Sequence, residues 1–217
     1  MEMALWQQGV LLLTGLIAIY MIKFFVDQQK NEGTAGTFNI YYMISFAVLL
    51  VSGLLLIFNG WDILGLFGED SQPSKFVAIV AGLIPFSLAI GLVMQYYPEH
   101  GKNTLIFFIV GLLLIATTKY AYTTPPGWGK IVYPLFHAIA GFTIFFLPLF
   151  ASKAGKAPAG FYNVTIGGTI IGIGGIALAF IMNGKQLLFF SADFVSLILA
   201  PVLFLTALFF MLGFTKK

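Results

Sequence analysis

The stretch FVAIVAGLIPFSLAIGLVMQYY, which runs from Phe76 to Tyr97, decides the fold class. None of its side chains carries a charge. An α-helix rises about 1.5 Å per residue, so roughly 20 apolar residues are needed to cross about 30 Å of hydrocarbon. The stretch is long enough to cross a membrane as a helix. A strand of a transmembrane barrel would instead alternate apolar and polar residues over about ten positions.

Six further apolar stretches lie on either side of it. Because every backbone polar group needs a partner inside lipid, each stretch is expected to form a helix. The connections between them are too short to hold a second domain. We therefore predict one all-α integral membrane domain over residues 1–217, a bundle of seven transmembrane helices. The expected helices cover residues 5–26, 39–58, 76–97, 104–120, 131–151, 161–182 and 187–214.

The composition supports a membrane location. Hydrophobic residues make up 59% of the chain and charged residues 9%, whereas a soluble domain carries about 25% charged residues. This excludes a soluble enzyme and a nucleic-acid-binding domain. The chain has no cysteine, so it has no thiolate ligands for an iron–sulfur cluster.

The lysines predict the orientation of the chain. If the N-terminus lies outside, the inner connections and the C-terminus hold more lysines than the outer ones, so the positive-inside rule favours an outer N-terminus and an inner C-terminus. The first apolar stretch lacks a preceding basic segment and a small-residue cleavage site, so we expect it to be retained. We expect a bacterial or archaeal cytoplasmic membrane. The inner lysines would be Lys23, Lys30, Lys102, Lys153, Lys156, Lys216 and Lys217, against Lys75, Lys119, Lys130 and Lys185 outside.

His137 is the candidate cofactor ligand, because haem in a helical bundle is held by imidazole. The other histidine, His100, is expected at the opposite membrane surface, so the two histidines could not both ligate one haem iron. A haem at His137 would then take its second ligand from a partner chain at a shared interface. The alternative is a histidine that is hydrogen-bonded to a neighbouring helix.

Asp193 is the candidate for ion or proton handling, because a carboxylate at membrane depth is costly and marks such pathways. The alternative is that Ser191 or Asp193 caps the true start of the last helix. In that case the remaining residues 194–214 are still enough to span a membrane.

Small residues predict close helix packing at two places. Gly168, Gly172 and Gly175 recur at i, i+4 and i+7 of the sixth stretch, a pattern that lets helix backbones approach closely in membranes. Ser87 and Gly91 form a second small face. The sequence leaves open whether the partner helix belongs to this chain or to another. Four prolines inside the apolar stretches, Pro85, Pro134, Pro148 and Pro201, each remove a backbone donor.

No motif of a hydrolase, kinase or metalloprotease is found, and the acidic residues of the second connection, Asp62, Glu69 and Asp70, are interpreted as a solubilising surface rather than a site for a hard cation. A retinal protein is excluded, because the last stretch has no lysine between Lys185 and Lys216. We expect a non-catalytic helical subunit of a larger membrane complex, of the respiratory or energy-converting kind, that packs against partner helices, lipids or quinone. Two alternatives stay open: a transporter of small solutes or protons, and a haem-binding membrane subunit that uses His137.

Overall fold

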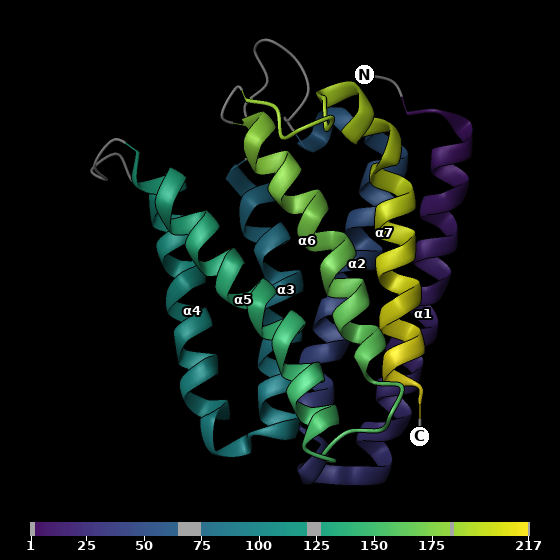
Figure 1. The fold of residues 1–217 in the computed structure, drawn as a ribbon, viewed down its shortest axis with the longest axis vertical. Helices are drawn as coiled ribbons and strands as arrows, with labels where there is room; N and C mark the ends of the chain where they lie inside the picture. The colour runs from purple at the N-terminus through teal and green to yellow at the C-terminus, as the bar shows by residue number, and fades with distance from the viewer. Residues whose placement is uncertain (1–2, 65–74, 121–126, 183–184, 217) are drawn as a thin grey trace.

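The computed structural model describes residues 3–64, 75–120, 127–182 and 185–216. In these ranges the chain is all-helical, without a strand, and seven of its helices are long and apolar enough to cross a membrane (Figure 1). The helices are α1 (Leu5–Glu32), α2 (Phe38–Asn59), α3 (Lys75–Tyr96), α4 (Pro98–Tyr120), α5 (Trp128–Lys153), α6 (Tyr162–Met182) and α7 (Ala192–Phe214), with short 3-10 turns η1 (Gly33–Gly36) and η2 (Trp61–Leu64).

Six of the helices close into a ring. Going round it, α1 packs on α2, α2 on α3, α3 on α5, α5 on α6, α6 on α7, and α7 again on α1. The remaining helix, α4, lies outside this ring against α3 and α5 (Figure 1). The first and last helices are therefore direct neighbours.

The two chain termini lie at opposite ends of the bundle (Figure 1). We call these the N-terminal end and the C-terminal end. The N-terminal end holds the start of α1, the turn η2 and the start of α7. The C-terminal end holds η1, the tight α3–α4 connection at Tyr97 and the α5–α6 linker (154–161).

Two helices differ from the sequence-based expectation because of their ends. The first helix continues to Glu32 and stops at Gly33, whose φ of 59° lies in the left-handed region that glycine adopts without strain. The fourth begins at Pro98 rather than residue 104. Proline fits the first helical position, where its missing N–H costs no hydrogen bond.

The seventh helix begins later than the apolar stretch. Ser191 has an extended backbone, and its Oγ accepts a hydrogen bond from the Phe194 N–H at 3.2 Å, so it is the N-cap. Leu188, just before it, has a positive φ of 50°. Residues 187–190 therefore form a turn, and the helix has the start that the capping alternative expects.

Aromatic side chains fill the centre of the six-helix ring, towards the C-terminal end of the bundle. Tyr42 is fully buried, and its ring centroid lies 4.8 Å from that of Phe25 and 4.6 Å from that of Phe214. Phe161 lies 5.5 Å from Phe214. These spacings are typical of favourable aromatic pairs. One aromatic cluster thus joins α1, α2, α7 and the α5–α6 linker.

A second cluster of aromatic side chains holds α4 against α3 and α5 of the six-helix ring. The rings of Phe86 and Phe108 lie 4.8 Å apart, and those of Phe107 and Phe136 lie 4.9 Å apart. Gly111 makes this approach possible, because a Cβ there would lie 2.7 Å from Cε1 of Phe136. The position of α4 therefore depends on one glycine and four phenylalanines.

Gly91 performs the same role between α2 and α3. A Cβ built on it would lie 2.5 Å from Cε1 of Tyr42. The Tyr42 hydroxyl donates to Gln95 Oε1 at 2.7 Å, one helical turn further along α3. The tyrosine ring thus lies across the backbone of α3 at Gly91 and is held there by a buried hydrogen bond.

We predict that Gly91→Ala lowers the free energy of unfolding by about 1–3 kcal/mol, the usual cost of overpacking a filled core. The Tyr42 ring cannot retreat without losing Gln95. Gly53→Ala in α2 is the matched control, because a Cβ there meets nothing within 4 Å. Thermal unfolding in detergent measures both, and equal stability of the two variants would contradict this packing.

Candidate functional site

The predicted glycine face of α6 divides into two parts. A Cβ on Gly168 would lie 3.0 Å from Cγ2 of Ile144, so this glycine packs against α5. Gly172 and Gly175 are exposed, and a Cβ on either meets nothing within 4 Å. Only the first of the three glycines therefore packs against another helix of the described chain.

Another glycine face of α6, not selected from the sequence, packs against α7. A Cβ on Gly167 would lie 2.7 Å from Cδ1 of Phe210, and one on Gly174 would lie 3.3 Å from Cγ1 of Val202. Gly213 faces back, with Val164 Cγ2 at 2.6 Å from its built Cβ. The sequence GGTIIGIGG places glycines at a seven-residue spacing on both faces, so the pattern alone could not choose between them.

Pro148 lies beside a polar contact between α5 and α6. The proline lacks an N–H, so the Ile144 carbonyl four residues earlier loses its helical donor. On the next carbonyl, that of Phe145, Thr165 Oγ1 of α6 donates a hydrogen bond at 2.8 Å. Gly168 packs against Ile144 at the same level. The two helices thus meet where the α5 backbone is interrupted.

His137 lies on α5, with its imidazole between two aromatic rings. The ring centroids of Tyr133 and Phe86 lie 5.0 Å and 6.3 Å from that of His137. Its Nδ1 is buried and has no hydrogen-bond partner in the described chain, although the residue as a whole is partly exposed. The alternative of a hydrogen bond from Nδ1 to a neighbouring helix is therefore not met within the described ranges.

Asp193 lies in the first turn of α7 and is exposed. A carboxylate at this position interacts favourably with the helix dipole. Asp193 also lines a pocket of about 580 Å³ at the N-terminal end, which we call the N-terminal pocket. The other residues lining this pocket are Ala4, Gln7, Trp61, Ser191, Phe194, Ser196 and Leu197. Because α6 separates α5 from α7 in the ring, Asp193 and His137 belong to separate places.

Gln7 connects three parts of the N-terminal end, although sequence reasoning did not select it. Its Oε1 accepts from the Ala4 N–H at 3.0 Å and from Nε1 of Trp61 at 3.3 Å. Its Nε2 donates to the carbonyls of Ser196 at 2.8 Å and Leu197 at 3.3 Å. The side chain is 4% exposed and uses both its oxygen and its nitrogen. It ties α1, η2 and α7 together.

The bond from Gln7 to Leu197 has a specific cause. Pro201, four residues further along α7, has no N–H, so the Leu197 carbonyl lacks its helical donor. A buried acceptor left without a partner costs about 1–3 kcal/mol. Gln7 supplies the missing donor from the neighbouring helix. A glutamine one turn inside the first span and a proline in the last span are the sequence features that could have indicated this contact.

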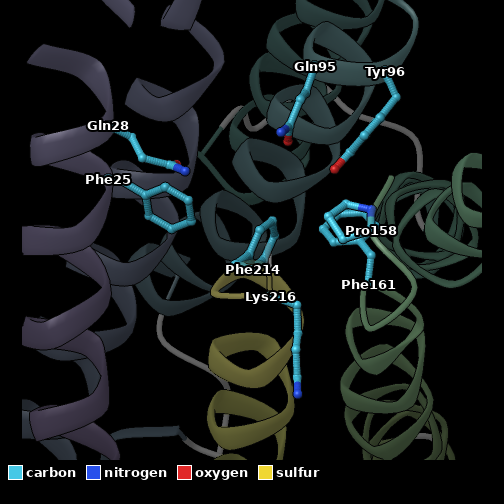
Figure 2. Close-up of a pocket in the computed structure, with 8 residues that line it drawn as sticks. All are labelled: Phe25, Gln28, Gln95, Tyr96, Pro158, Phe161, Phe214 and Lys216. Carbon is cyan, nitrogen blue, oxygen red and sulfur yellow. The ribbon is translucent and has the colours of Figure 1, made fainter. Parts of the chain in front are cut away.

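A second cavity lies at the C-terminal end, and we call it the C-terminal cavity. It has a volume of about 140 Å³ and is enclosed by four segments far apart in sequence. Figure 2 shows the polar ends of Gln28, Gln95 and Tyr96 directed towards one space above Phe214. Phe25, Pro158, Phe161 and Lys216 complete the lining. Gln95 is thus part of both the Tyr42 contact and this cavity.

Within the described ranges, no group of three or more histidine, aspartate or glutamate side chains is placed to hold a metal ion. No protein-family model matches the sequence, and neither a curated protein nor a solved structure gives a match.

We predict that Gln7→Leu lowers the free energy of unfolding by about 2 kcal/mol, because it leaves the Leu197 carbonyl and the Trp61 N–H unpaired. In a Pro201→Ala background the loss should be smaller, since residue 201 then donates to Leu197 itself. Unfolding of the two single variants and the double variant in detergent gives this coupling energy.

Gln8→Leu is the matched control, because Gln8 is adjacent and its side chain makes no hydrogen bond to any described residue. It should leave stability within about 0.5 kcal/mol of the parent. If Gln7→Leu costs the same with and without Pro201, the assigned role of the glutamine is wrong.

Proposed function

We propose that the chain spans a membrane seven times and acts as a non-catalytic helical subunit of a larger complex, of the respiratory or energy-converting kind. The observation that carries this proposal is the exposed part of the α6 glycine face. Gly172 and Gly175 have open space beside them in the described chain. A second, separate membrane chain is the partner that this surface fits.

At a lipid-facing position, a glycine lowers the stability of its helix and has one structural use. Glycine weakens a helix interior by about 0.5–1 kcal/mol relative to alanine and has no side chain to contact lipid. Its use in a membrane helix is to let another backbone approach closely. The neighbours Ile173 and Ile176 are 47% and 54% exposed. Together they form an apolar surface with a shallow centre, which a partner helix would fill.

The lysines support a cytoplasmic location of the C-terminal end. Lys30, Lys102 and Lys156 lie in or beside its connections, and Lys216 follows α7. Basic residues concentrate on the cytoplasmic side of membrane proteins. The N-terminal end, with the N-terminal pocket, would then face outward. A shared haem or quinone remains part of this proposal, with the partly exposed His137 as the candidate ligand for the haem.

We predict that Gly172→Leu and Gly175→Leu leave the isolated chain folded and release it from its complex. The leucine side chain meets no atom of this chain but occupies the space a partner backbone needs. The measurement is native mass after mild-detergent purification from native membranes. The parent should carry other subunits in a fixed ratio, and the variants should run near 23.7 kDa.

Gly9→Leu in α1 is the matched control, because a Cβ on this exposed glycine also meets nothing within 4 Å and lies outside the α6 surface. Gly167→Leu is the opposite control and should unfold the chain, since Phe210 fills that space. A parent protein that purifies alone, without bound subunits, would contradict the proposal.

A second candidate function, transport of small solutes or protons, is favoured by the position of the two cavities. Both are lined by α1 and the ends of α7, and they lie at opposite ends of the bundle. Asp193 lines one and Gln95 lines the other. The packed rings of Phe25, Tyr42 and Phe214 lie between α1, α2 and α7 beside the C-terminal cavity. This arrangement would correspond to a closed state of a transport path.

If this second function holds, Asp193→Asn should lower proton flux at least about ten-fold without changing stability, because it removes the charged group from the N-terminal pocket. Purified chain in vesicles with an enclosed pH-sensitive dye gives the flux. Asp27→Asn, an exposed acid near the other end of the bundle, is the control. Unchanged flux in Asp193→Asn would remove this residue from any transport mechanism.

A further inference from the structure

The C-terminal cavity brings together hydrogen-bond donors from helices that are far apart in sequence. Gln28 comes from α1, while Gln95 and Tyr96 come from the end of α3 (Figure 2). The described chain provides no hydrogen-bond acceptor for the Tyr96 hydroxyl or for the Gln28 amide. These groups are therefore free to bind a guest in the cavity.

The Gln95 side chain has a fixed orientation. Its Oε1 is occupied by the Tyr42 hydroxyl at 2.7 Å, and Tyr42 is fully buried. The amide nitrogen of Gln95 has no acceptor in the described chain and can only donate, while Oε1 keeps one lone pair beside the bond from Tyr42. The cavity therefore presents donors from Gln95 and Tyr96 side by side on one helix end.

The charges around the cavity are positive. Lys216 lines it through its stem, which packs beside Gly160, and Figure 2 shows its ammonium group directed away from Gln28, Gln95 and Tyr96. Lys156 is not a lining residue, but its Nζ lies 3.5 Å from the backbone carbonyl oxygen of Tyr96, a lining residue, and 4.3 Å from the centre of the Tyr97 ring. Among the described residues that line the cavity, none is acidic. Donors and cations without a carboxylate select an anionic oxygen group.

The volume of the C-terminal cavity and its place in the bundle limit the kind of ligand that it can bind. A cavity of about 140 Å³ exceeds the space that a single water needs, yet it is smaller than the pockets that hold drug-sized ligands. It lies at the lysine-rich end of the bundle, beside the rings of Phe25, Phe161 and Phe214. A small anionic group with an apolar attachment matches this lining.

We propose that the C-terminal cavity binds a phosphate group, either that of an anionic lipid or free phosphate. Gln28, Gln95 and Tyr96 would donate to its oxygens, and the exposed Lys216 side chain would turn towards the bound group and supply the positive charge. This inference does not depend on the proposed subunit or transport function.

The test uses the full chain in detergent with two probes. Native mass spectrometry counts phosphatidylglycerol and phosphatidylcholine retained after reconstitution and extraction, and titration calorimetry follows inorganic phosphate. We expect phosphatidylglycerol to be retained preferentially. Tyr96→Phe, which removes one donor without changing shape, and Lys216→Gln should each weaken binding about ten-fold.

Tyr162→Phe and Lys153→Gln are the matched controls, because both residues are exposed at the same end and lie outside the cavity. They should leave binding unchanged. Binding of inorganic phosphate with the same variant dependence, but without lipid retention, would identify free phosphate as the source. Equal retention of both lipids together with no Tyr96- or Lys216-dependent phosphate binding would overturn the proposal. Because Lys216 is exposed, its variant remains informative even if Tyr96→Phe is unstable.

Discussion

The bundle depends on hydrogen bonds from one helix to backbone carbonyls beside the prolines of the next. Gln7 donates to the Leu197 carbonyl that Pro201 leaves without a partner, and Thr165 donates to Phe145 beside the break at Pro148. Ser45 donates to the Ile84 carbonyl just before Pro85, at 2.9 Å. Of these three carbonyls, that of Leu197 is the one left without its own helical donor by a proline four residues later, so it needs the donor that Gln7 supplies from the neighbouring helix. Each contact fixes the relative height of two helices: α1 with α7, α5 with α6, and α2 with α3.

Apolar side chains pack between the helix pairs that these hydrogen bonds join. Where backbones approach, glycines remove the side chains that would collide, as Gly91 does beneath Tyr42 and Gly111 beneath Phe136. Where the chain leaves space, the two ends of the bundle hold the N-terminal pocket and the C-terminal cavity, both beside α1 and α7. The outer face of α6 is different, because its glycines have no neighbour in the described chain. The proposed partner contact and the proposed phosphate site therefore use separate surfaces of one scaffold.

The seven helices were predictable because the length of an apolar run is a one-dimensional property of the sequence. The choice between two starts for α7 needed the cap geometry of Ser191, which the sequence offered only as an alternative. The pairing of helices could not be derived, because a glycine at i and i+7 looks the same on either face of α6. Gln7 was missed because its partner, the carbonyl freed by Pro201, lies 190 residues away. The described structure also places α4 outside the ring, and local patterns carry no information about that.

The measurement that tests the account most directly is the sidedness of the two ends of the bundle. Because the chain has no cysteine, single cysteines at exposed positions can be labelled with a membrane-impermeant maleimide in right-side-out vesicles. Gln186→Cys, at the N-terminal end, should be labelled in intact vesicles. Thr34→Cys, at the C-terminal end, should be labelled only after the membrane is opened with detergent. Labelling of both positions from the same side would contradict a bundle that crosses the membrane with its N-terminal end outside.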